Sequence, residues 1–437
     1  MLESSPAFEV RPEGRVGLQR VAVIGLGYIG LPTAATMAAA GLEVQGVDVN
    51  EATVAAINAG RAPFVEPDLE DLVAHEVRRG TLRAATTAEP ADAFVIAVPT
   101  PFGPDRTPDL SFIEAACRSL APLLTGGELV VVESTSPPGA TRQAASWVLE
   151  ERPDLSLDGE GGRPTVHFAH CPERVLPGKV LMELVNNDRV VGGVTRRAAE
   201  LARDLYATFC RGQILLTDDV TAEMVKLVEN SYRDVNIAFA NELSTVCEAV
   251  GVNVWELIRL ANHHPRVNIL QPGPGVGGHC IAVDPWFIVD AAPQQARLIK
   301  MAREVNDAKP DWVLEQVRRE LPGVSRPTIA ALGLSFKPDI DDLRESPARR
   351  IVARLAEEYP AGRILAVEPH IDALPADLAA LPNVELSGLT PAVAAADVVV
   401  LLVDHSAFGR MDRTGSARLV DTRGAWTGGL GTLEGER

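Results

Sequence analysis

Residues 21–30 read VAVIGLGYIG and join a short β-branched run to a glycine-rich turn. An apolar run of this length that ends in glycines predicts a buried parallel strand. The small residues that follow, from Ile29 to Ala40, predict a helix that stops at Gly41. Strand, glycine turn and helix in this order are the context in which the GxGxxG pattern indicates a dinucleotide site.

An acid 18 residues after the last of these glycines indicates which dinucleotide is bound. The glycines Gly25, Gly27 and Gly30 permit a tight turn, close approach of the backbone to a pyrophosphate and close helix packing. The N-terminus of the helix then faces the phosphates. Asp48 ends the next strand-like run, and a carboxylate there accepts hydrogen bonds from the ribose 2′-OH and repels a 2′-phosphate. The sequence therefore predicts NAD rather than NADP.

The alternation of strands and helices recurs on both sides of a helical stretch. Strand-like runs lie at 93–98 and 128–132 and, after Pro322, at 328–333, 363–367 and 397–403. Residues of about 218–262 have a proline-free helical pattern, which predicts one long central helix suited to a dimer contact. We expect an α/β protein in which two Rossmann-like doubly wound domains are joined by a helical central domain. The expected segments are a flexible tail at 1–18, an NAD-binding domain at 19–215, the helical domain at 216–320 and the second Rossmann-like domain at 321–437.

Composition excludes several classes of partner. The net charge of −18 repels nucleic acid and anionic membranes. The five cysteines are scattered without a CxxC pair or zinc spacing, which favours reduced thiols and no metal site. No apolar run reaches the ~20 residues of a membrane helix, and the first 19 residues lack the core of a signal peptide. We expect a cytoplasmic protein without a nucleic-acid or membrane partner.

The segment QPGPGVGGHC at 271–280 is unusually rich in glycine and ends in a cysteine. Its backbone can crowd a ligand, and Cys280 sits where a loop enters an apolar run. A helix N-terminus there lowers the pKa of a thiol, and Asp284 lies four residues on. A lone cysteine is more often an inert core residue. The glycines and the nearby acid favour a nucleophile instead.

Two pairs of polar residues are weaker candidates. Lys226 and Asn230 are neighbours on one helix face and are able to stabilise an alkoxide, although a solvated face is the alternative. Lys337 and Arg344 are cations placed for phosphates, although each alone is typical of an ordinary surface. Ser346, followed by a proline, is a predicted helix N-cap.

Together the motifs resemble those of the nucleotide-sugar 6-dehydrogenases, the UDP-glucose/GDP-mannose dehydrogenase family, from about Arg20 to Trp426. The matching motifs are GLGYIG at 25–30, VPTPF at 98–102, ESTSPPG at 133–139, KLVEN at 226–230, PGVGGHC at 274–280 and SFKPDIDDLRESP at 335–347. The segments CPERVLPGK at 171–179, NDRVVGG at 187–193 and HPRVNILQP at 264–272 resemble the branch that acts on UDP-N-acetylmannosamine. UDP-N-acetylglucosamine dehydrogenases share a PER-type segment and UDP-glucose dehydrogenases usually have NPEFL, so these two sugars are the alternatives.

The resemblance implies an NAD-dependent four-electron oxidation of the sugar C6 alcohol to a carboxylate, through a thiohemiacetal and a thioester on Cys280. It also implies a UDP-sugar-binding domain at 321–437, a homodimer or higher homo-oligomer, and surface polysaccharide synthesis as the use of the product. The implied catalytic residues are Cys280, Lys226, Asn230, Asp284, Glu173 and Thr135. The implied cofactor contacts are Gly25, Gly27, Tyr28, Ile29, Gly30, Asp48, Thr100, Thr135 and Arg344. The implied substrate contacts are Arg174, Val175, Leu176, Lys179, Lys226, Asn230, Gly275, Lys337 and Arg266, the last across a subunit boundary.

Two other functions share part of this pattern. A sugar-acid or hydroxyacyl dehydrogenase has the same start and a helical second half, but transfers one hydride and needs no thiol. An NAD-sensing regulatory module needs the dinucleotide turn alone, because a fold does not fix a function. Counting NADH per product, and alkylating the thiol, separates these functions from the one that the resemblance implies.

Overall fold

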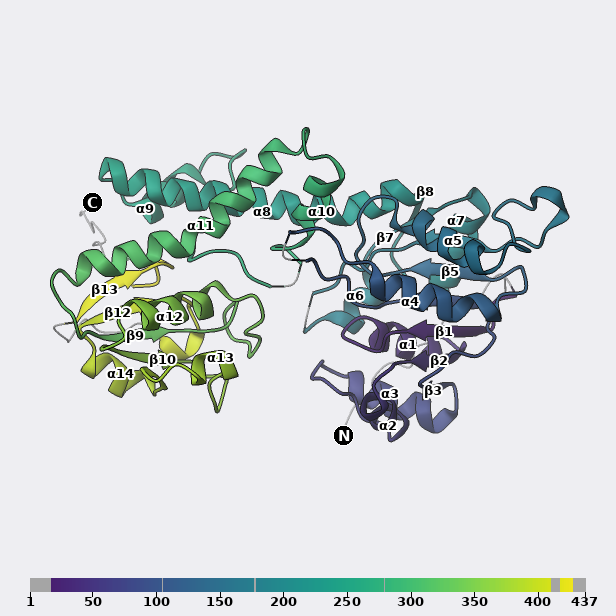
Figure 1. The fold of residues 1–437 in the computed structure, drawn as a ribbon, viewed down its shortest axis with the longest axis horizontal. Coiled ribbons are helices and arrows are strands. Elements are labelled where there is room, and N and C mark those ends of the chain that lie inside the picture. Colours follow the sequence, from purple (N-terminus) through teal and green to yellow (C-terminus); the bar gives the residue numbers. More distant parts are fainter. Residues whose placement is uncertain (1–16, 104, 177, 279, 410–416, 427–437) are drawn as a thin grey trace, which may run out of the picture. The chain divides into compact units, whose positions relative to one another are not determined.

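The computed structural model describes residues 17–103, 105–176, 178–278, 280–409 and 417–426 (Figure 1). The chain divides into two compact units, one formed by residues up to Glu229 with Trp286–Ala291, the other by Asn230–Pro285 and the residues from Ala292 onward. The expected flexible tail at 1–18 lies almost entirely outside the described residues. Each unit contains a twisted sheet of mainly parallel strands covered by helices, so the predicted α/β class is confirmed.

The first unit is organised around an eight-stranded sheet in the order β3-β2-β1-β4-β5-β6-β7-β8. Its pairs are parallel except β6 with β7. With β1 central and the chain winding outward on both sides, this is a doubly wound sheet. The strands predicted at 21–24, 43–48, 93–98 and 128–132 are confirmed as β1, β2, β4 and β5. The strands are β1 (Arg20–Ile24), β2 (Glu43–Val47), β3 (Leu82–Ala85), β4 (Ala93–Ile96), β5 (Leu129–Val132), β6 (His167–His170), β7 (Arg189–Gly193) and β8 (Ile214–Asp218).

Helices cover both faces of this sheet, which explains why β1 is apolar throughout. Val21 and Val23 join one buried cluster, whereas Ala22 and Ile24 join the cluster on the opposite face. A strand buried on both faces cannot alternate apolar and polar residues. The helices of this unit are α1 (Gly30–Ala39), α2 (Glu51–Asn58), α3 (Leu69–Arg79), α4 (Ser111–Leu120), α5 (Ala140–Glu151), α6 (Val180–Asn186) and α7 (Arg196–Tyr206).

The single long helix predicted at about 218–262 is two helices, α8 (Asp219–Val250) and α9 (Val254–Ala261). Gly251 has φ +74° and ends α8 in the left-handed region. The Asn253 side chain then accepts hydrogen bonds from the first amides of α9. The missing proline suggested continuity, but a glycine and an Asn cap interrupt the helix equally well. Two more helices follow, α10 (Asp284–Ala291) and α11 (Arg297–Glu320).

The second unit contains a five-stranded parallel sheet in the order β11-β10-β9-β12-β13. The three predicted strands are confirmed as β9, β10 and β12, and Ser346 caps α12 as predicted, because its hydroxyl accepts from the Arg349 amide. The elements are β9 (Thr328–Leu332), α12 (Pro347–Glu358), β10 (Arg363–Val367), α13 (Ala376–Ala379), β11 (Val384–Leu386), α14 (Leu389–Ala395), β12 (Val398–Leu401) and β13 (Arg418–Asp421).

The two sheets repeat one turn geometry after their central strands. Gly25 and Gly333 have φ values of +90° and +91°, and each donates its amide at 2.8 Å to the end of the neighbouring strand. The next amide along, from Leu26 or Leu334, donates to an acid at the end of that strand, Asp48 or Glu368, at 2.9 and 2.7 Å. The second copy has Pro338 where the first has its third glycine, and its helix α12 begins only at residue 347.

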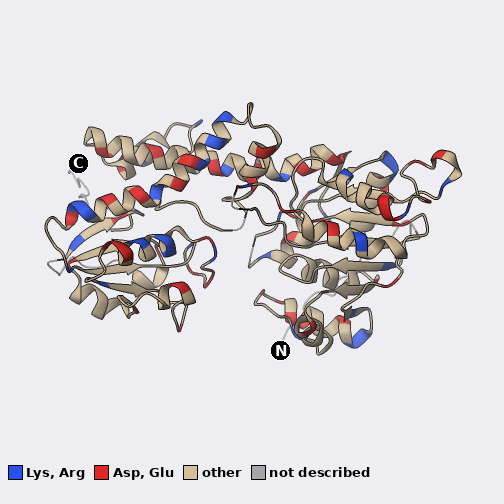
Figure 2. Ribbon diagram, viewed as in Figure 1, with Lys and Arg blue, Asp and Glu red and all other residues tan. Residues whose placement is uncertain are grey.

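Charged side chains of both signs are mixed on the helices. Figure 2 shows acidic and basic residues interspersed along α11, where the ion pairs include Lys300–Glu304 and Arg318–Glu315. Within the described ranges, no helix is both long and apolar enough to span a membrane.

Candidate functional site

The glycine turn after β1 leaves room for a ligand at one position and not at the others. A Cβ on Gly25 would lie 2.5 Å from the Ala97 carbonyl oxygen, and one on Gly30 would lie 1.8 Å from the Gly25 carbonyl oxygen. The chain itself therefore requires these two glycines. A Cβ on Gly27 would meet nothing within 4 Å, so this glycine keeps open space above the turn. With no side chain capping α1, the turn fits a pyrophosphate.

Asp48 lies at the end of β2, as predicted, and braces this turn. One carboxylate oxygen accepts from the Leu26 amide at 2.9 Å and the other accepts from the Asn50 amide at 2.9 Å. An ionised carboxylate has about four acceptor positions, so these two bonds leave capacity for ribose hydroxyls.

Two predicted threonines meet at the carboxyl ends of β4 and β5. The Thr100 hydroxyl donates to the Thr135 carbonyl oxygen at 2.6 Å, and Ser134 donates to the Val98 carbonyl oxygen at 2.7 Å. These bonds join the VPTPF and ESTSPPG loops at the edge where open α/β sheets bind ligands.

Glu173 belongs to a buried charge cluster that the sequence did not reveal. Arg189 donates to Glu173 at 3.3 Å and lies 4.0 Å from Glu133, whose carboxylate also accepts from the Tyr206 hydroxyl at 3.2 Å. One guanidinium thus faces two buried carboxylates. Burial and then the charge of Glu173 raise the pKa of Glu133 to about 8, which favours its protonated form. Its only sequence signal was its place as the first residue of ESTSPPG.

The segment at 171–179, which contains four of the predicted substrate contacts, is held on α8 by an ion pair. The Arg174 guanidinium pairs with Glu229 at 3.0 Å and donates to the Asp188 carbonyl oxygen at 3.2 Å. Its charge is therefore used in part to hold the segment. Val175 is half-buried, whereas Leu176 and Lys179 are exposed.

Three of the predicted catalytic residues lie together in the second unit. Cys280 is exposed one turn before α10, and its carbonyl oxygen accepts from the Asp284 amide at 2.8 Å. Asp284 is buried and accepts at 2.5 Å from the side-chain amide of Asn230 on α8. Lys226 lies one helical turn before Asn230 and is half-buried.

The glycines before Cys280 lie close to other parts of the protein. A Cβ on Gly277 would lie 2.5 Å from the Glu345 carbonyl oxygen, and one on Gly278 would lie 3.2 Å from the Phe336 ring. A Cβ on Gly275, a predicted substrate contact, would lie 3.0 Å from Pro347. These glycines let the cysteine loop pack directly against the 336–347 segment.

Three of the cations predicted to contact ligands are exposed in the second unit, two of them on the loop between β9 and α12. Arg344 forms a bidentate pair with Asp342 at 2.8 and 2.6 Å, so a phosphate has to share this charge. Lys337 follows β9, and Arg266 follows α9.

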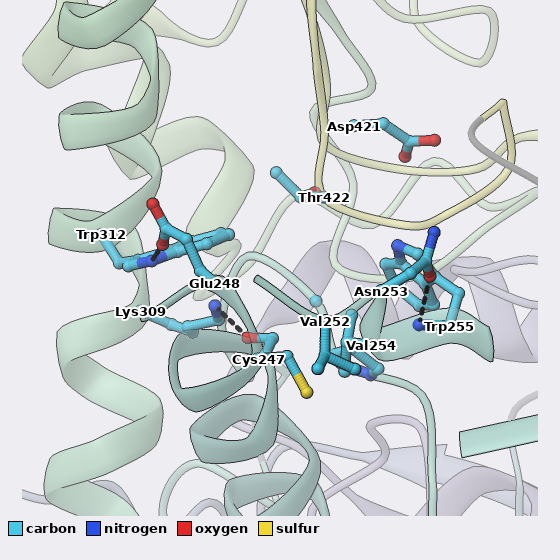
Figure 3. Close-up of a pocket in the computed structure, with 13 residues that line it drawn as sticks. Cys247, Glu248, Val252, Asn253, Val254, Trp255, Lys309, Trp312, Asp421 and Thr422 are labelled. Atoms are coloured by element: carbon cyan, nitrogen blue, oxygen red, sulfur yellow. Dashed lines mark hydrogen bonds between the residues drawn. The ribbon is translucent and has the colours of Figure 1, made fainter. Parts of the chain in front are cut away.

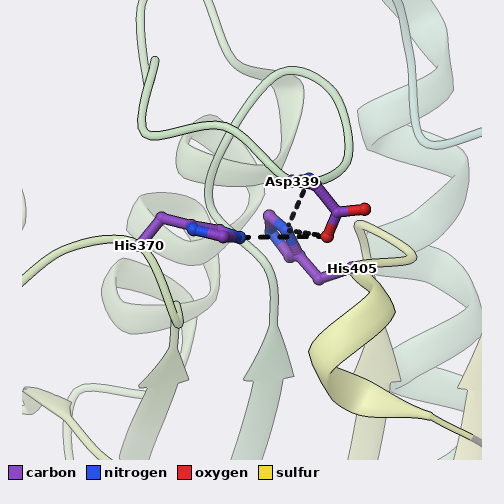
Figure 4. Close-up of side chains that lie close together, drawn as sticks. All are labelled: Asp339, His370 and His405. Carbon is purple, nitrogen blue, oxygen red and sulfur yellow. Dashed lines mark hydrogen bonds and ion pairs between the residues drawn. The ribbon is translucent and has the colours of Figure 1, made fainter. Parts of the chain in front are cut away.

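Asp339, His370 and His405 bring possible metal-ligand atoms within 4.8 Å of one another (Figure 4). Both ring nitrogens of buried His405 are already engaged, Nδ1 accepting from the Asp339 amide at 2.9 Å and Nε2 pairing with Glu368 at 3.0 Å. The cluster therefore anchors the loop after β9, and His405 has no lone pair ready for a metal.

A cavity of about 220 Å³ lies between the end of α8, the start of α9 and α11 (Figure 3). Lys309 is buried there and donates to the Ser244 hydroxyl at 2.6 Å. Burial lowers the pKa of Lys309 to about 7. None of the predicted site residues lines this cavity.

A turn that fits a dinucleotide in one unit, and an exposed cysteine beside an acid and an amide in the other, define an NAD-dependent oxidoreductase. Comparison with known families agrees. The NAD-binding domain of the UDP-glucose/GDP-mannose dehydrogenase family matches residues 19–210, its central domain 220–308 and its UDP-binding domain 330–428. The chain belongs to this family.

Individual relatives extend over nearly the whole chain. An NDP-N-acetyl-D-galactosaminuronic acid dehydrogenase of Ralstonia nicotianae is 58% identical over 94% of this chain and 97% of its own. A UDP-N-acetyl-D-mannosamine dehydrogenase of Escherichia coli strain K12 is 54% identical over 93% and 99%. A solved UDP-N-acetyl-mannosamine dehydrogenase from S. aureus is 39% identical, with a TM-score of 0.78 over 94% of this chain and 96% of that one.

Proposed function

We propose that this enzyme oxidises the C6 alcohol of UDP-N-acetylmannosamine to the carboxylate. The E. coli and S. aureus relatives carry that activity in their names, and the segments at 171–179, 187–193 and 264–272 support it from the sequence. The observation that carries the chemistry is the group formed by Cys280, Asp284 and Asn230, since a dehydrogenase that stops at the aldehyde needs no thiol.

Residues of the first unit hold the cofactor. Gly27 and the N-terminus of α1 receive the pyrophosphate, Asp48 the ribose, and Thr100 with Thr135 line the edge of the sheet. When bound, NAD accepts a hydride from C6 of the sugar in each of two oxidations.

Cys280 supplies covalent catalysis between these oxidations. Its thiolate adds to the C6 aldehyde, a C–S bond forms, and the carbonyl oxygen takes up a proton to give a thiohemiacetal. The second oxidation converts this adduct to a thioester. Water then attacks the thioester carbon and the C–S bond breaks, which releases the carboxylate and restores the thiolate.

The polar residues around the thiol stabilise the oxyanions. Asp284 holds one N–H of the Asn230 amide, which fixes its rotamer and leaves the second N–H for the substrate oxygen. Lys226, one turn away, adds a positive charge. Asp284 and Thr135 position or activate the hydrolytic water, and Glu173 takes part in the hydrolysis. Arg344 contacts a cofactor phosphate. The UDP-sugar is contacted by Arg174, Val175, Leu176, Lys179, Arg266, Gly275 and Lys337.

The test is to count NADH formed per sugar consumed by the pure protein. UDP-N-acetylmannosamine, UDP-N-acetylglucosamine, UDP-N-acetylgalactosamine and UDP-glucose are supplied in parallel. We expect two NADH per sugar, with the highest kcat/KM for the mannosamine compound. One NADH per sugar contradicts the thioester route, and no turnover with any of them contradicts the proposed function.

A galacto-configured nucleotide sugar is the second candidate. The Ralstonia relatives named for N-acetylgalactosaminuronic acid are 57–58% identical, against 54% for the E. coli mannosamine enzyme. A sugar epimer is discriminated by few contacts, each worth ~1–3 kcal/mol, so this difference in identity favours no sugar decisively. A higher kcat/KM for UDP-N-acetylgalactosamine in the same assay selects this candidate.

We further propose a cytoplasmic homodimer or higher homo-oligomer that associates through α8. Tyr232, Phe239 and Val246 are 73, 52 and 48% exposed and follow one another at seven-residue intervals, so they form one apolar stripe on the helix. The five free thiols suit a reducing compartment. The proposed domain limits are 19–215, 216–320 and 321–437.

A further inference from the structure

Glu66, in the loop between α2 and α3, is a buried acid that joins three segments of the first unit. Its side chain is 6% exposed. One oxygen accepts from the Tyr28 hydroxyl at 2.8 Å and from the Gly178 amide at 2.9 Å, while the other accepts from the Val180 amide at 2.8 Å. Hydrogen bonds to an ionised acceptor are about twice as strong as neutral ones.

The partners of Glu66 belong to the two ligand sites. Tyr28 is part of the glycine turn that faces the cofactor, and its ring stacks on Phe64 with the ring centroids 4.8 Å apart. Gly178 and Val180 lie at the end of the segment assigned to the sugar and at the start of α6. Glu66 therefore links the two segments directly through hydrogen bonds.

We propose that Glu66 is a positioning residue that couples the two sites, so that cofactor bound over the glycine turn strengthens binding of the nucleotide sugar. A pyrophosphate on the turn restrains Tyr28, and through Glu66 it restrains the backbone at Gly178 and Val180. The sugar then binds to a segment that is already ordered, which gives positive cooperativity without a new contact. By linkage the sugar strengthens cofactor binding by the same factor. The inference rests on the proposed function, because that function assigns the segment to the sugar.

The experiment measures the Kd of UDP-N-acetylmannosamine by calorimetry with and without saturating NADH, which permits no turnover. In the wild type we expect NADH to lower this Kd by about fivefold or more, the usual lower range of allosteric coupling. Tyr28→Phe removes one hydroxyl and keeps the ring on Phe64. We expect Tyr28→Phe, Glu66→Gln and the double variant each to reduce the effect of NADH on this Kd to less than about twofold. Asp71→Asn, at an exposed acid on α3, is the matched control and keeps the full effect.

The outcomes separate this inference from the proposed function. An active wild type whose Kd does not respond to NADH overturns the coupling, as does a Tyr28→Phe variant that keeps the full response. An inactive wild type contradicts the proposed function instead. Melting temperatures identify an unstable Glu66→Gln variant, in which case Tyr28→Phe decides. A purely structural role lowers the melting temperature but leaves the ratio of the two Kd values unchanged.

Discussion

In the proposed mechanism, Cys280 is the residue on which the second oxidation depends. Without the thiolate no thioester forms, so we expect Cys280→Ala to produce no carboxylate and at most one NADH per sugar in a single turnover. Quenched-flow counting of NADH, with product analysis, checks this. Cys247→Ala is the control, because that thiol is buried against the cavity in Figure 3 and has no role in the proposed chemistry. Formation of two NADH per sugar by Cys280→Ala contradicts the role of Cys280 as the nucleophile.

Glu133 makes stability depend on pH in a direction opposite to that of most acids. Its pKa rises from 4.5 unfolded to about 8 folded, so the folded state binds the additional proton between these values and loses stability as pH rises. The slope approaches ~1.4 kcal/mol per pH unit for one fully buried group. Glu133→Gln copies the neutral acid. We therefore expect the melting temperature of the variant, relative to wild type, to increase from pH 5 to pH 8.

The measurement is thermal unfolding across this range, compared as a difference between the two proteins. Burial lowers the pKa of His170 to about 3 and that of Lys309 to about 7. The pH dependence of stability that these groups cause is common to both proteins, so it cancels in the difference. Gln143→Ala, an exposed substitution on α5 that changes no titratable group, is the control and gives a difference that does not change with pH. If the difference in melting temperature between Glu133→Gln and the wild type also stays constant across this pH range, Glu133 is ionised in the folded protein.

At the scale of elements, the sequence predicted the strands and helices that a local pattern of apolar residues specifies. Most of the predicted strands are short apolar runs, and burial on both faces requires such runs. These strands are β1, β4, β5, β9, β10 and β12. Strands β3, β6, β7, β8, β11 and β13 were not predicted, and neither was α11, which contains Pro310. A proline inside a helix breaks the pattern by which a helix is identified.

The same limit applies to the candidate site. The glycine turn, Asp48 and the group at Cys280 follow from motifs whose spacing along the chain fixes their meaning. Glu66 and Glu133 do not, because their partners lie up to 114 and 73 residues away. A single acid in the sequence carries no sign that it will be buried. Only the folded chain reveals which acids are buried and what they hold.

At the scale of the whole molecule, the apolar stripe on α8 predicts the state of association. Phe239→Glu places a charge at the centre of the stripe, and burying an unpaired charge in an interface costs several kcal/mol, on the order of 3–5. We expect this variant to be monomeric at micromolar concentration by light scattering after size exclusion. Arg233→Glu, exposed on α8 but about 120° around the helix from Phe239, keeps the oligomer. An unchanged mass for Phe239→Glu places the interface elsewhere.

The packing of Gly277 and Gly278 on Phe336 and Glu345 constrains how this family can be recombined. A chimaera that takes the C-terminal third of the chain from a relative has the two sides of this contact from different parents. The two sides pack so closely at Gly277 that an added methyl group does not fit. Successful crossovers therefore carry residues 271–278 and 335–347 together from one parent. The same packing restricts recombination in nature, and we therefore expect the cysteine loop and residues 335–347 to be inherited together.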